Sequence, residues 1–160
     1  MSVAFRRESD EEHLEPTFEL PIPPGPNRVT ARGLALTQAK VAALEAAVAA
    51  QDDEEARKTV QRALRYWRTR LATAQVMPAA EGVSVSFGAR VTYRRAGQER
   101  RIDIVGDDEA EPAAGRIAFS APLARAMMGA QAGEQVDFGG GAIDIVAVEP
   151  IPPEDDAARQ

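Results

Sequence analysis

Two acidic runs are the residues best suited to chemistry in this sequence of 160 residues. The first consists of Asp52, Asp53, Glu54 and Glu55, and the second of Asp107, Asp108 and Glu109. Carboxylate oxygens are the hard ligands that Mg²⁺ prefers, so each run is a candidate for coordination of a metal ion. The structural alternatives are a solvated turn with helix-capping carboxylates for the first run, and a surface loop or partner contact for the second.

A run of basic residues follows the first acidic run. It contains Arg57, Lys58, Arg62, Arg65, Arg68 and Arg70. A stripe of this kind can line a wall that faces RNA or DNA. The alternative is a solvated helix face whose charges are balanced by acidic neighbours.

Other kinds of chemistry have little support. The chain has no cysteine and a single histidine, His13, so we expect no thiolate site and no metal of its own. The formal net charge of -6 argues against binding that depends mainly on phosphate contacts. Gly139, Gly140 and Gly141 lack the Lys and Ser/Thr of a phosphate loop, so we interpret them as a turn. No apolar run is seen to approach the roughly 20 residues that span a bilayer, which predicts a cytoplasmic protein with no membrane contact.

Two helices are expected to position the first acidic run and the basic run. Residues 1–28 form an acidic and proline-rich tail, in which helix is disfavoured. Thr30 is a suitable N-cap for a helix that reaches about Ala50. Seam positions with a period of 3.5 follow in both segments: Leu34, Thr37, Val41, Leu44 and Val48, then Val60, Leu64, Trp67 and Leu71. The connection over residues 51–55 is short, which predicts an antiparallel helical hairpin over residues 29–76, with Asp53 capping its second helix.

A compact β domain is expected over residues 82–149. Strand-like segments cover residues 83–87, 89–94, 100–105 and 116–120, and a last hairpin joins 135–138 to 142–148. Pro122 begins one short helix and Gly129 ends it. The tail over residues 150–160 is proline-rich and acidic. The fold class is therefore α+β, and an intramolecular hairpin favours a monomer.

An ordered set of short motifs runs through the carboxyl half: Phe87-Gly88-Ala89 with Val91-Thr92, Ile104-Val105-Gly106-Asp107-Asp108-Glu109-Ala110, Pro122-Leu123-Ala124-Arg125-Ala126, and the pairs Gly133-Glu134 and Gly139-Gly140. In these motifs the carboxyl half resembles the Gre family (GreA/GreB) of bacterial transcription factors. Upstream, Val29-Thr30 with Arg32-Gly33-Leu34 is similar to the start of the family's first helix, and Ala74-Gln75-Val76 to the exit from its second. The similarity extends over about 120 residues in the same order.

The resemblance implies that the β domain is FKBP-like and docks at the rim of the secondary channel of RNA polymerase. It also implies that the hairpin projects into this channel, where acidic tip residues share an Mg²⁺ of the polymerase active site and stimulate cleavage of backtracked RNA. The docking candidates are Asp107, Asp108, Glu109, Ser120, Pro122, Leu123 and Arg125. The basic residues Arg57, Lys58, Arg62, Arg65 and Arg68 are candidates for contact with the channel, nascent RNA or DNA.

The hairpin departs from the family pattern. The family's long acidic tip segment has no counterpart, and each arm is about ten residues shorter, which removes about 15 Å of reach. With its short hairpin the chain resembles the short-armed Rnk proteins of the family. This departure favours a non-enzymatic elongation regulator with weak or no cleavage stimulation, and a full cleavage factor is the alternative. A coiled-coil adaptor and a peptidyl-prolyl isomerase are more distant alternatives.

Overall fold

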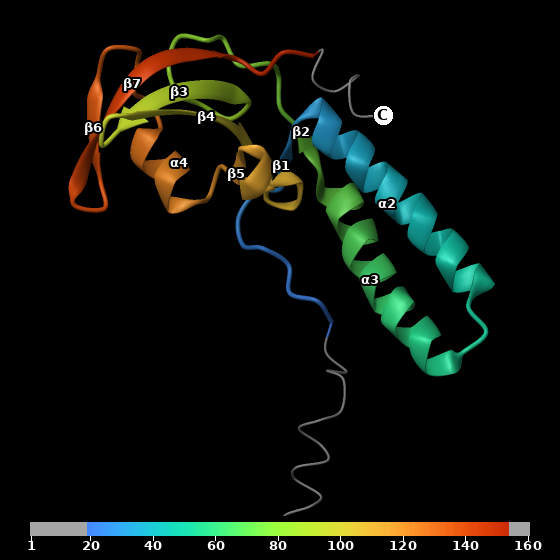
Figure 1. Cartoon of the computed structure of the whole chain (residues 1–160). Helices are drawn as coiled ribbons and strands as arrows, with labels where there is room; N and C mark the ends of the chain where they lie inside the picture. Colours follow the sequence, from blue (N-terminus) through green and yellow to red (C-terminus); the bar gives the residue numbers. More distant parts are fainter. Residues whose placement is uncertain (1–18, 154–160) are drawn as a thin grey trace, which may run out of the picture.

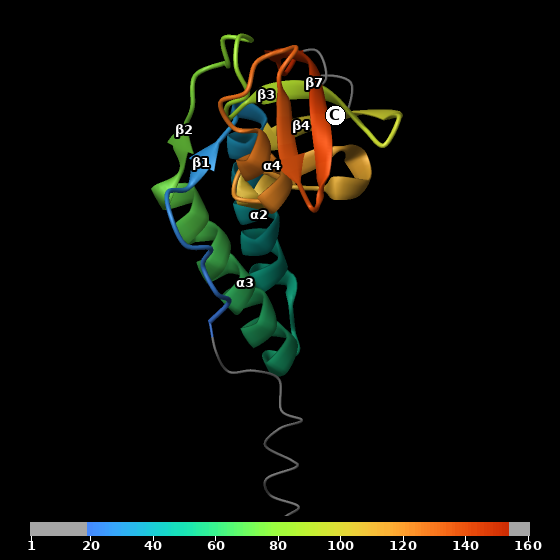
Figure 2. The same ribbon diagram turned by 90° about the vertical axis from the view of Figure 1, so that its left-hand side faces the viewer.

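The computed structural model describes residues 19–153 and consists of a helical hairpin that extends from a small β domain (Figure 1). Most of both predicted tails, including His13, lies outside these residues. Figure 2, turned by 90°, shows the hairpin below the sheet and pointing away from it.

The hairpin is formed by α2 (Ala31–Ala50) and α3 (Glu54–Thr73). Thr30 caps α2 because its hydroxyl oxygen accepts a hydrogen bond from the Gly33 amide at 3.0 Å. Asp53 caps α3 in the same way, with its carboxylate 2.9 Å from the Ala56 amide nitrogen. Both predicted caps and the antiparallel hairpin are confirmed.

The seam between α2 and α3 follows the predicted spacing. Thr37, Val41 and Leu64 are buried, and the remaining seam residues of the two helices are half-buried. At the base of the hairpin, β1 (Arg28–Val29) and β2 (Gln75–Val76) form a two-residue parallel pair. This pair joins the residues before α2 to the residues after α3, so the two ends of the hairpin leave it side by side.

The β domain is a five-stranded sheet with the order β5-β4-β3-β7-β6. Its strands are β3 (Ala89–Arg95), β4 (Gln98–Val105), β5 (Arg116–Ala118), β6 (Gln135–Phe138) and β7 (Gly141–Pro150). All neighbours are antiparallel except β4 and β5. The connection from β4 to β5 contains two 3₁₀ turns, η1 (Asp107–Glu109) and η2 (Pro112–Ala114).

One short helix, α4 (Pro122–Met127), packs against the sheet and completes the core. Its buried residues Ala124 and Met127 meet apolar side chains from the sheet, among them Val91, Ile104 and Ile145. The α+β class and the position of the short helix are confirmed. The description of this domain as FKBP-like stays a prediction.

The predicted strand over residues 83–87 is wrong. Val85 and Phe87 are buried as an alternating strand would require, but this segment makes a single bridge, Ser84 to Gln131. Its backbone bonds instead with the turn after α4, where the Val85 amide donates to the Ala130 carbonyl at 2.8 Å. Local alternation identified the buried side chains but not the absence of a strand partner.

The expectation that no segment is long and apolar enough to cross a membrane is also wrong. Helix α2 meets that test by length and composition, with a mean hydropathy of 1.2 over its 18-residue window. Alanine, leucine and valine supply this hydropathy. In the structure α2 lies along the strongly charged α3, which places it in the arm of the hairpin.

Candidate functional site

The acidic tip lies where α2 turns into α3. Asp52, Asp53, Glu54 and Glu55 are all exposed. Asp53 is used as the N-cap of α3, and Glu54 and Glu55 lie in the first turn, where they favour the positive end of the helix dipole. The tip therefore has a structural function in addition to any contact with a partner.

Within residues 19–153, no group of three or more Asp, Glu or His side chains is arranged to hold a metal ion. Two or more exposed carboxylates at a tip can complete the coordination of a metal that another protein holds. This is the chemistry that the tip can offer.

The basic residues of α3 are mostly engaged with neighbouring oxygens. Arg57 turns back to the tip and donates from Nε and Nη2 to the Gln51 carbonyl, at 3.1 and 2.5 Å. Three ion pairs follow along the helix, Lys58–Glu55, Arg65–Glu19 and Arg68–Glu45. Each of these pairs is strongly exposed, so water and salt weaken it and a partner can replace it.

A second acidic cluster joins the hairpin to the β domain. We call Asp108 and Glu109 of η1, together with Thr30, Tyr66 and Arg70 of the hairpin, the junction clamp. Glu109 accepts from the Thr30 hydroxyl at 2.5 Å, and Asp108 accepts from Arg70 Nε at 2.5 Å and from the Tyr66 hydroxyl. The clamp therefore holds both helices of the hairpin to a single turn of the β domain.

Glu109 occupies the amino-terminal end of α2. Its side chain is 4% exposed and also forms an ion pair with Arg32 at 3.1 Å. A carboxylate at a helix amino terminus is favoured by the helix dipole. Gly33 allows this approach, because a Cβ at that position would lie 2.8 Å from Glu109 Oε1.

Arg70 is the most deeply buried charged residue of the clamp, with a side chain 2% exposed. Its Nη2 donates to Asn27 Oδ1 at 2.8 Å, and Asn27 Nδ2 donates to the Arg70 carbonyl at 2.7 Å. A buried guanidinium is tolerated when it is paired and hydrogen-bonded in this way. Arg70 therefore does not belong to the exposed basic face on which the sequence appeared to place it.

Tyr66 has a raised pKa and donates a hydrogen bond to Asp108. Burial raises the pKa of the Tyr66 hydroxyl to about 12, and the hydrogen bond to Asp108 contributes to the shift. The phenol therefore stays protonated and donates to Asp108 throughout the neutral range. Sequence reasoning missed Tyr66, although its spacing of four residues from Arg70 places both side chains on one face of the helix.

The docking candidates separate into two places. Ser120 lies next to η1 and donates to Asp107 at 2.6 Å. Pro122 and Arg125 of α4 are exposed, while Leu123 packs partly against the core. Asp108 and Glu109 are engaged within the chain, so their contact with a partner stays a prediction, as does that of the α4 residues.

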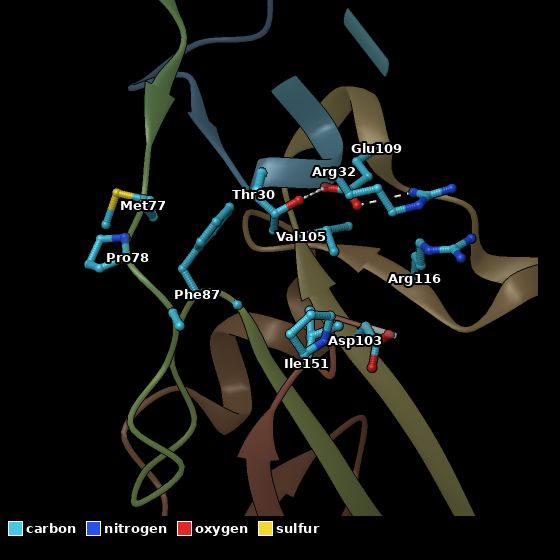
Figure 3. Close-up of a pocket in the computed structure, with 14 residues that line it drawn as sticks. Thr30, Arg32, Met77, Pro78, Phe87, Asp103, Val105, Glu109, Arg116 and Ile151 are labelled. Carbon is cyan, nitrogen blue, oxygen red and sulfur yellow. Dashed lines mark hydrogen bonds and ion pairs between the residues drawn. The ribbon is translucent and has the colours of Figure 1, made fainter. Parts of the chain in front are cut away.

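A cavity of about 190 Å³ lies between the base of the hairpin and the sheet (Figure 3). Its apolar wall consists of Met77, Pro78, Phe87, Val105 and Ile151, and its polar wall includes Thr30, Arg32, Asp103, Glu109 and Arg116. In Figure 3 the contacts of Glu109 with Thr30 and Arg32 close one side of the cavity. The base of the hairpin is therefore joined to the β domain by polar contacts that lie beside this cavity.

Comparison with known proteins shows what the β domain is similar to. Residues 80–150 match the family model described as "Transcription elongation factor, GreA/GreB, C-term". The chain is 41% identical over 73 residues to transcription elongation factor GreA of Allorhizobium ampelinum, covering 42% of this chain and 46% of that protein. It is 42% identical over 88 residues to GreA of Caulobacter vibrioides, covering 50% and 56%. The chain thus spans about half the length of the curated relatives it matches.

A solved structure is also similar. The crystal structure of GreA factor homolog 1 (Gfh1) protein of Thermus thermophilus aligns with 78% of this chain and 99% of its own, with a TM-score of 0.39 and 13% identity. A similarity at that TM-score supports no assignment. The match of residues 80–150 shows that the β domain is similar to the carboxyl-terminal domain of GreA/GreB transcription elongation factors.

Proposed function

We propose that this chain binds RNA polymerase through its β domain and regulates transcription elongation. The domain would dock at the rim of the secondary channel, and the hairpin would point into the channel. The chain is not an enzyme in this proposal. It acts in the cytoplasm, where polymerase is found, and stimulates the RNA cleavage of the polymerase weakly or not at all.

The match of residues 80–150 to the GreA/GreB carboxyl-terminal domain is the observation that carries this proposal. Two GreA proteins described as transcription elongation factors are 41% and 42% identical to the chain over 73 and 88 residues. The exposed residues Pro122 and Arg125 of α4 are available to a partner, since their side chains are not used in the core.

The length of the arm supports regulation over cleavage. Each helix of the hairpin has 20 residues, which corresponds to about 30 Å at 1.5 Å per residue. An arm shorter by about ten residues loses about 15 Å of reach. Coordination of Mg²⁺ requires an oxygen within about 2.1 Å, so side-chain rotamers cannot make up a difference of that size.

Full cleavage activity is the second candidate, because the tip carries four exposed acidic residues in the expected place. In that case the acidic tip would share an Mg²⁺ of the polymerase active site, which requires the body to dock deeper in the channel. The arm length favours the first candidate, and a cleavage assay separates the two.

The isomerase alternative has less support. An isomerase site needs an apolar pocket lined by aromatic side chains, and the aromatic residues of the β domain are Phe87, Tyr93, Phe119 and Phe138. Of these, Phe87 lines the cavity described above, while Tyr93 is buried in the core and Phe119 and Phe138 pack against it. A coiled-coil adaptor would instead bind a helical protein and leave polymerase unbound.

The test is binding to the cognate RNA polymerase, measured by fluorescence anisotropy of the labelled full chain and by competition with full-length GreA. We expect saturable binding that GreA displaces, and binding weakened by the double variant Pro122→Ala, Arg125→Glu. Glu134→Gln, an exposed position elsewhere on the domain, serves as the matched control. Failure to bind polymerase would refute the proposal and favour an adaptor.

A further inference from the structure

A group of arginines lies at the end of the β domain opposite the arm. We call residues 94–101, which run from the end of β3 through a turn into β4, the arginine edge. It contains Arg94, Arg95, Arg100 and Arg101, with Glu99 as its one acidic residue. The arginine edge therefore has a net charge of +3, whereas the whole chain has a net charge of -6.

The arginine edge and the junction clamp lie at opposite ends of β4. This strand begins at Gln98, within the arginine edge, and ends at Val105, just before η1 of the clamp. Its eight residues span about 26 Å at about 3.3 Å per residue. In Figure 1 the arm leaves the β domain on one side, and the turn between β3 and β4 lies on the other. A partner bound at the arginine edge therefore leaves the arm free.

The strand register places the four guanidinium groups on both faces of the sheet. Cross-strand partners share a face, and successive side chains along a strand alternate between faces. Opposite Arg101 lies Thr92, two residues before Arg94, so Arg94 and Arg101 share one face. By the same alternation, Arg95 and Arg100 lie on the other face.

Three of these arginines are available to a partner. Arg101 is exposed, and its side chain makes no hydrogen bond or ion pair within residues 19–153. Arg100 donates to Gln98 Oε1 at 3.3 Å. Arg94 forms an ion pair with Glu99 at 3.3 Å, in which the side chains are 51% and 55% exposed. An exposed pair of this kind is weak, so phosphate can replace the carboxylate.

Arg95 is held in place by the neighbouring turn between β6 and β7. Its Nη2 donates to the Phe138 carbonyl at 3.4 Å, and its guanidinium carbon lies 5.1 Å from the centroid of the Phe138 ring. On β7, the carboxylate of Asp144 lies opposite Arg94 and accepts a hydrogen bond from Gln135 at 2.8 Å. Asp144 reduces the positive potential beside Arg94, so Arg100 and Arg101 carry most of the available charge.

The first half of β4 is an open edge of the sheet. Strand β5 pairs with Asp103, Ile104 and Val105. Within residues 19–153, no strand pairs with residues 98–101 on that side. An open edge presents unpaired backbone amides in addition to its side chains. Figure 2 shows this part of the chain, coloured yellow, extending past β7 at the margin of the β domain.

We propose that the arginine edge binds the phosphate backbone of duplex DNA, with the open edge of β4 directed into the major groove. This groove is about 12 Å wide and admits β-structure. Phosphates line both of its sides, which matches guanidinium groups on both faces of the sheet. A guanidinium also binds phosphate through two parallel hydrogen bonds. A single strand offers one row of phosphates, and the major groove of duplex RNA is deep and narrow, so duplex DNA fits better than either.

The contact is weak and has little sequence preference. Ala96 and Gly97 at the turn have no side-chain group that could bond to a base edge. About four phosphate contacts correspond to non-specific binding, with a Kd of about 10⁻⁴–10⁻⁶ M at physiological salt. Such affinity is effective where DNA is held nearby at high local concentration. The inference goes beyond the proposed function, and because the DNA contact is measured without polymerase, either can fail without the other.

The experiment compares two full-length double variants with the same change in net charge. The first carries Arg100→Gln and Arg101→Gln. The control carries Ala39→Glu and Ala46→Glu, two exposed positions of α2 in the arm. The probe is a fluorescein-labelled DNA duplex of about 20 base pairs, followed by fluorescence anisotropy at about 50 mM and about 200 mM salt. Oligouridine of about 20 nucleotides serves as the single-strand probe, and circular dichroism checks the fold of both variants.

We expect the parent chain to bind the duplex more tightly than the oligouridine. Arg100→Gln with Arg101→Gln should weaken binding to the duplex about tenfold at about 50 mM salt and should reduce the salt slope by about two. The control should lose less than about twofold, and Arg100→Lys with Arg101→Lys should retain most of the affinity, because the charge is kept.

Three results would overturn the proposal. The first is no binding of the duplex by the parent chain at about 50 mM salt. The second is an equal loss in the arginine variant and the control, because net charge alone would then explain it. The third is tighter binding of the oligouridine than of the duplex, which would assign the arginine edge to single-stranded RNA.

Discussion

Arg70 Nε lies 2.5 Å from Asp108 Oδ2, and this ion pair fastens the second helix of the hairpin to the turn that follows β4. The two residues are 38 positions apart in the sequence. Asp108 also accepts from Tyr66, one turn earlier in the same helix. Asp108 therefore fastens α3 to the β domain, and Glu109 does the same for the first helix.

Replacing Asp108 by Asn should be strongly destabilising. The change leaves the Arg70 guanidinium buried without a charged partner, and we expect the free energy of unfolding to fall by roughly 3 kcal/mol. Urea denaturation followed by circular dichroism measures this. Glu99→Gln removes the exposed pair with Arg94 and should cost less than about 1 kcal/mol. Equal losses in the two variants would show that the clamp is no stronger than a surface pair.

The pKa of Tyr66, raised from 10.0 to about 12, predicts a loss of stability at high pH. Because the folded pKa lies above the unfolded one, the contribution is fully present below pH 10 and is lost as the pH rises toward 12. In Tyr66→Phe this part of the pH dependence should disappear. Unfolding in urea at several alkaline pH values tests it, with Tyr93→Phe as the tyrosine control. A parallel fall in parent and Tyr66→Phe chains would contradict it.

Gly33→Ala should destabilise the chain even though alanine is the better helix former by about 1 kcal/mol. The added Cβ would lie 2.8 Å from Glu109 Oε1, which Thr30 and Arg32 hold in place. In a Glu109→Ala background that obstacle is gone, so the same change should become stabilising. A double-mutant cycle by urea denaturation tests this reversal of sign. An unchanged sign would show that Glu109 does not restrict this position.

Much of the hairpin could be predicted because its signals are local. Thr30 and Asp53 stand at the caps, and the seam repeats within each helix. The junction clamp could not be predicted in this way, because Thr30 and Glu109 are 79 positions apart and Tyr66 and Asp108 are 42 apart. Arg70 shares its residue type with the exposed basic face, and burial alone separates it from that face. The misassigned strand over residues 83–87 has the same cause, since its backbone partner lies after α4.

The turn between β3 and β4 offers a route to higher stability. Ala96 and Gly97 have φ values of 50° and 77°, and positive φ at both central residues defines a type I′ turn. Alanine is strained there, whereas asparagine is tolerated, so Ala96→Asn should raise the free energy of unfolding by roughly 0.5–1 kcal/mol. Thermal denaturation should show a rise of about 1–4 °C. Ala96→Val is the control and should lower the Tm, because a β-branched residue is disfavoured at positive φ. A higher Tm for valine than for asparagine would refute the assignment of the turn.

We propose that the chain binds RNA polymerase through its β domain and that its arm is too short for catalysis. The measurement that tests it most directly is transcript cleavage in a stalled, backtracked complex of the cognate polymerase, with and without full-length GreA. We predict that this chain alone gives little or no cleavage and that it slows cleavage by GreA. The contrary result is rapid cleavage by the chain alone that is abolished by Asp52→Asn, Asp53→Asn, Glu54→Gln and Glu55→Gln. These changes keep an asparagine N-cap at position 53, so such a loss would mean that the tip does reach the metal.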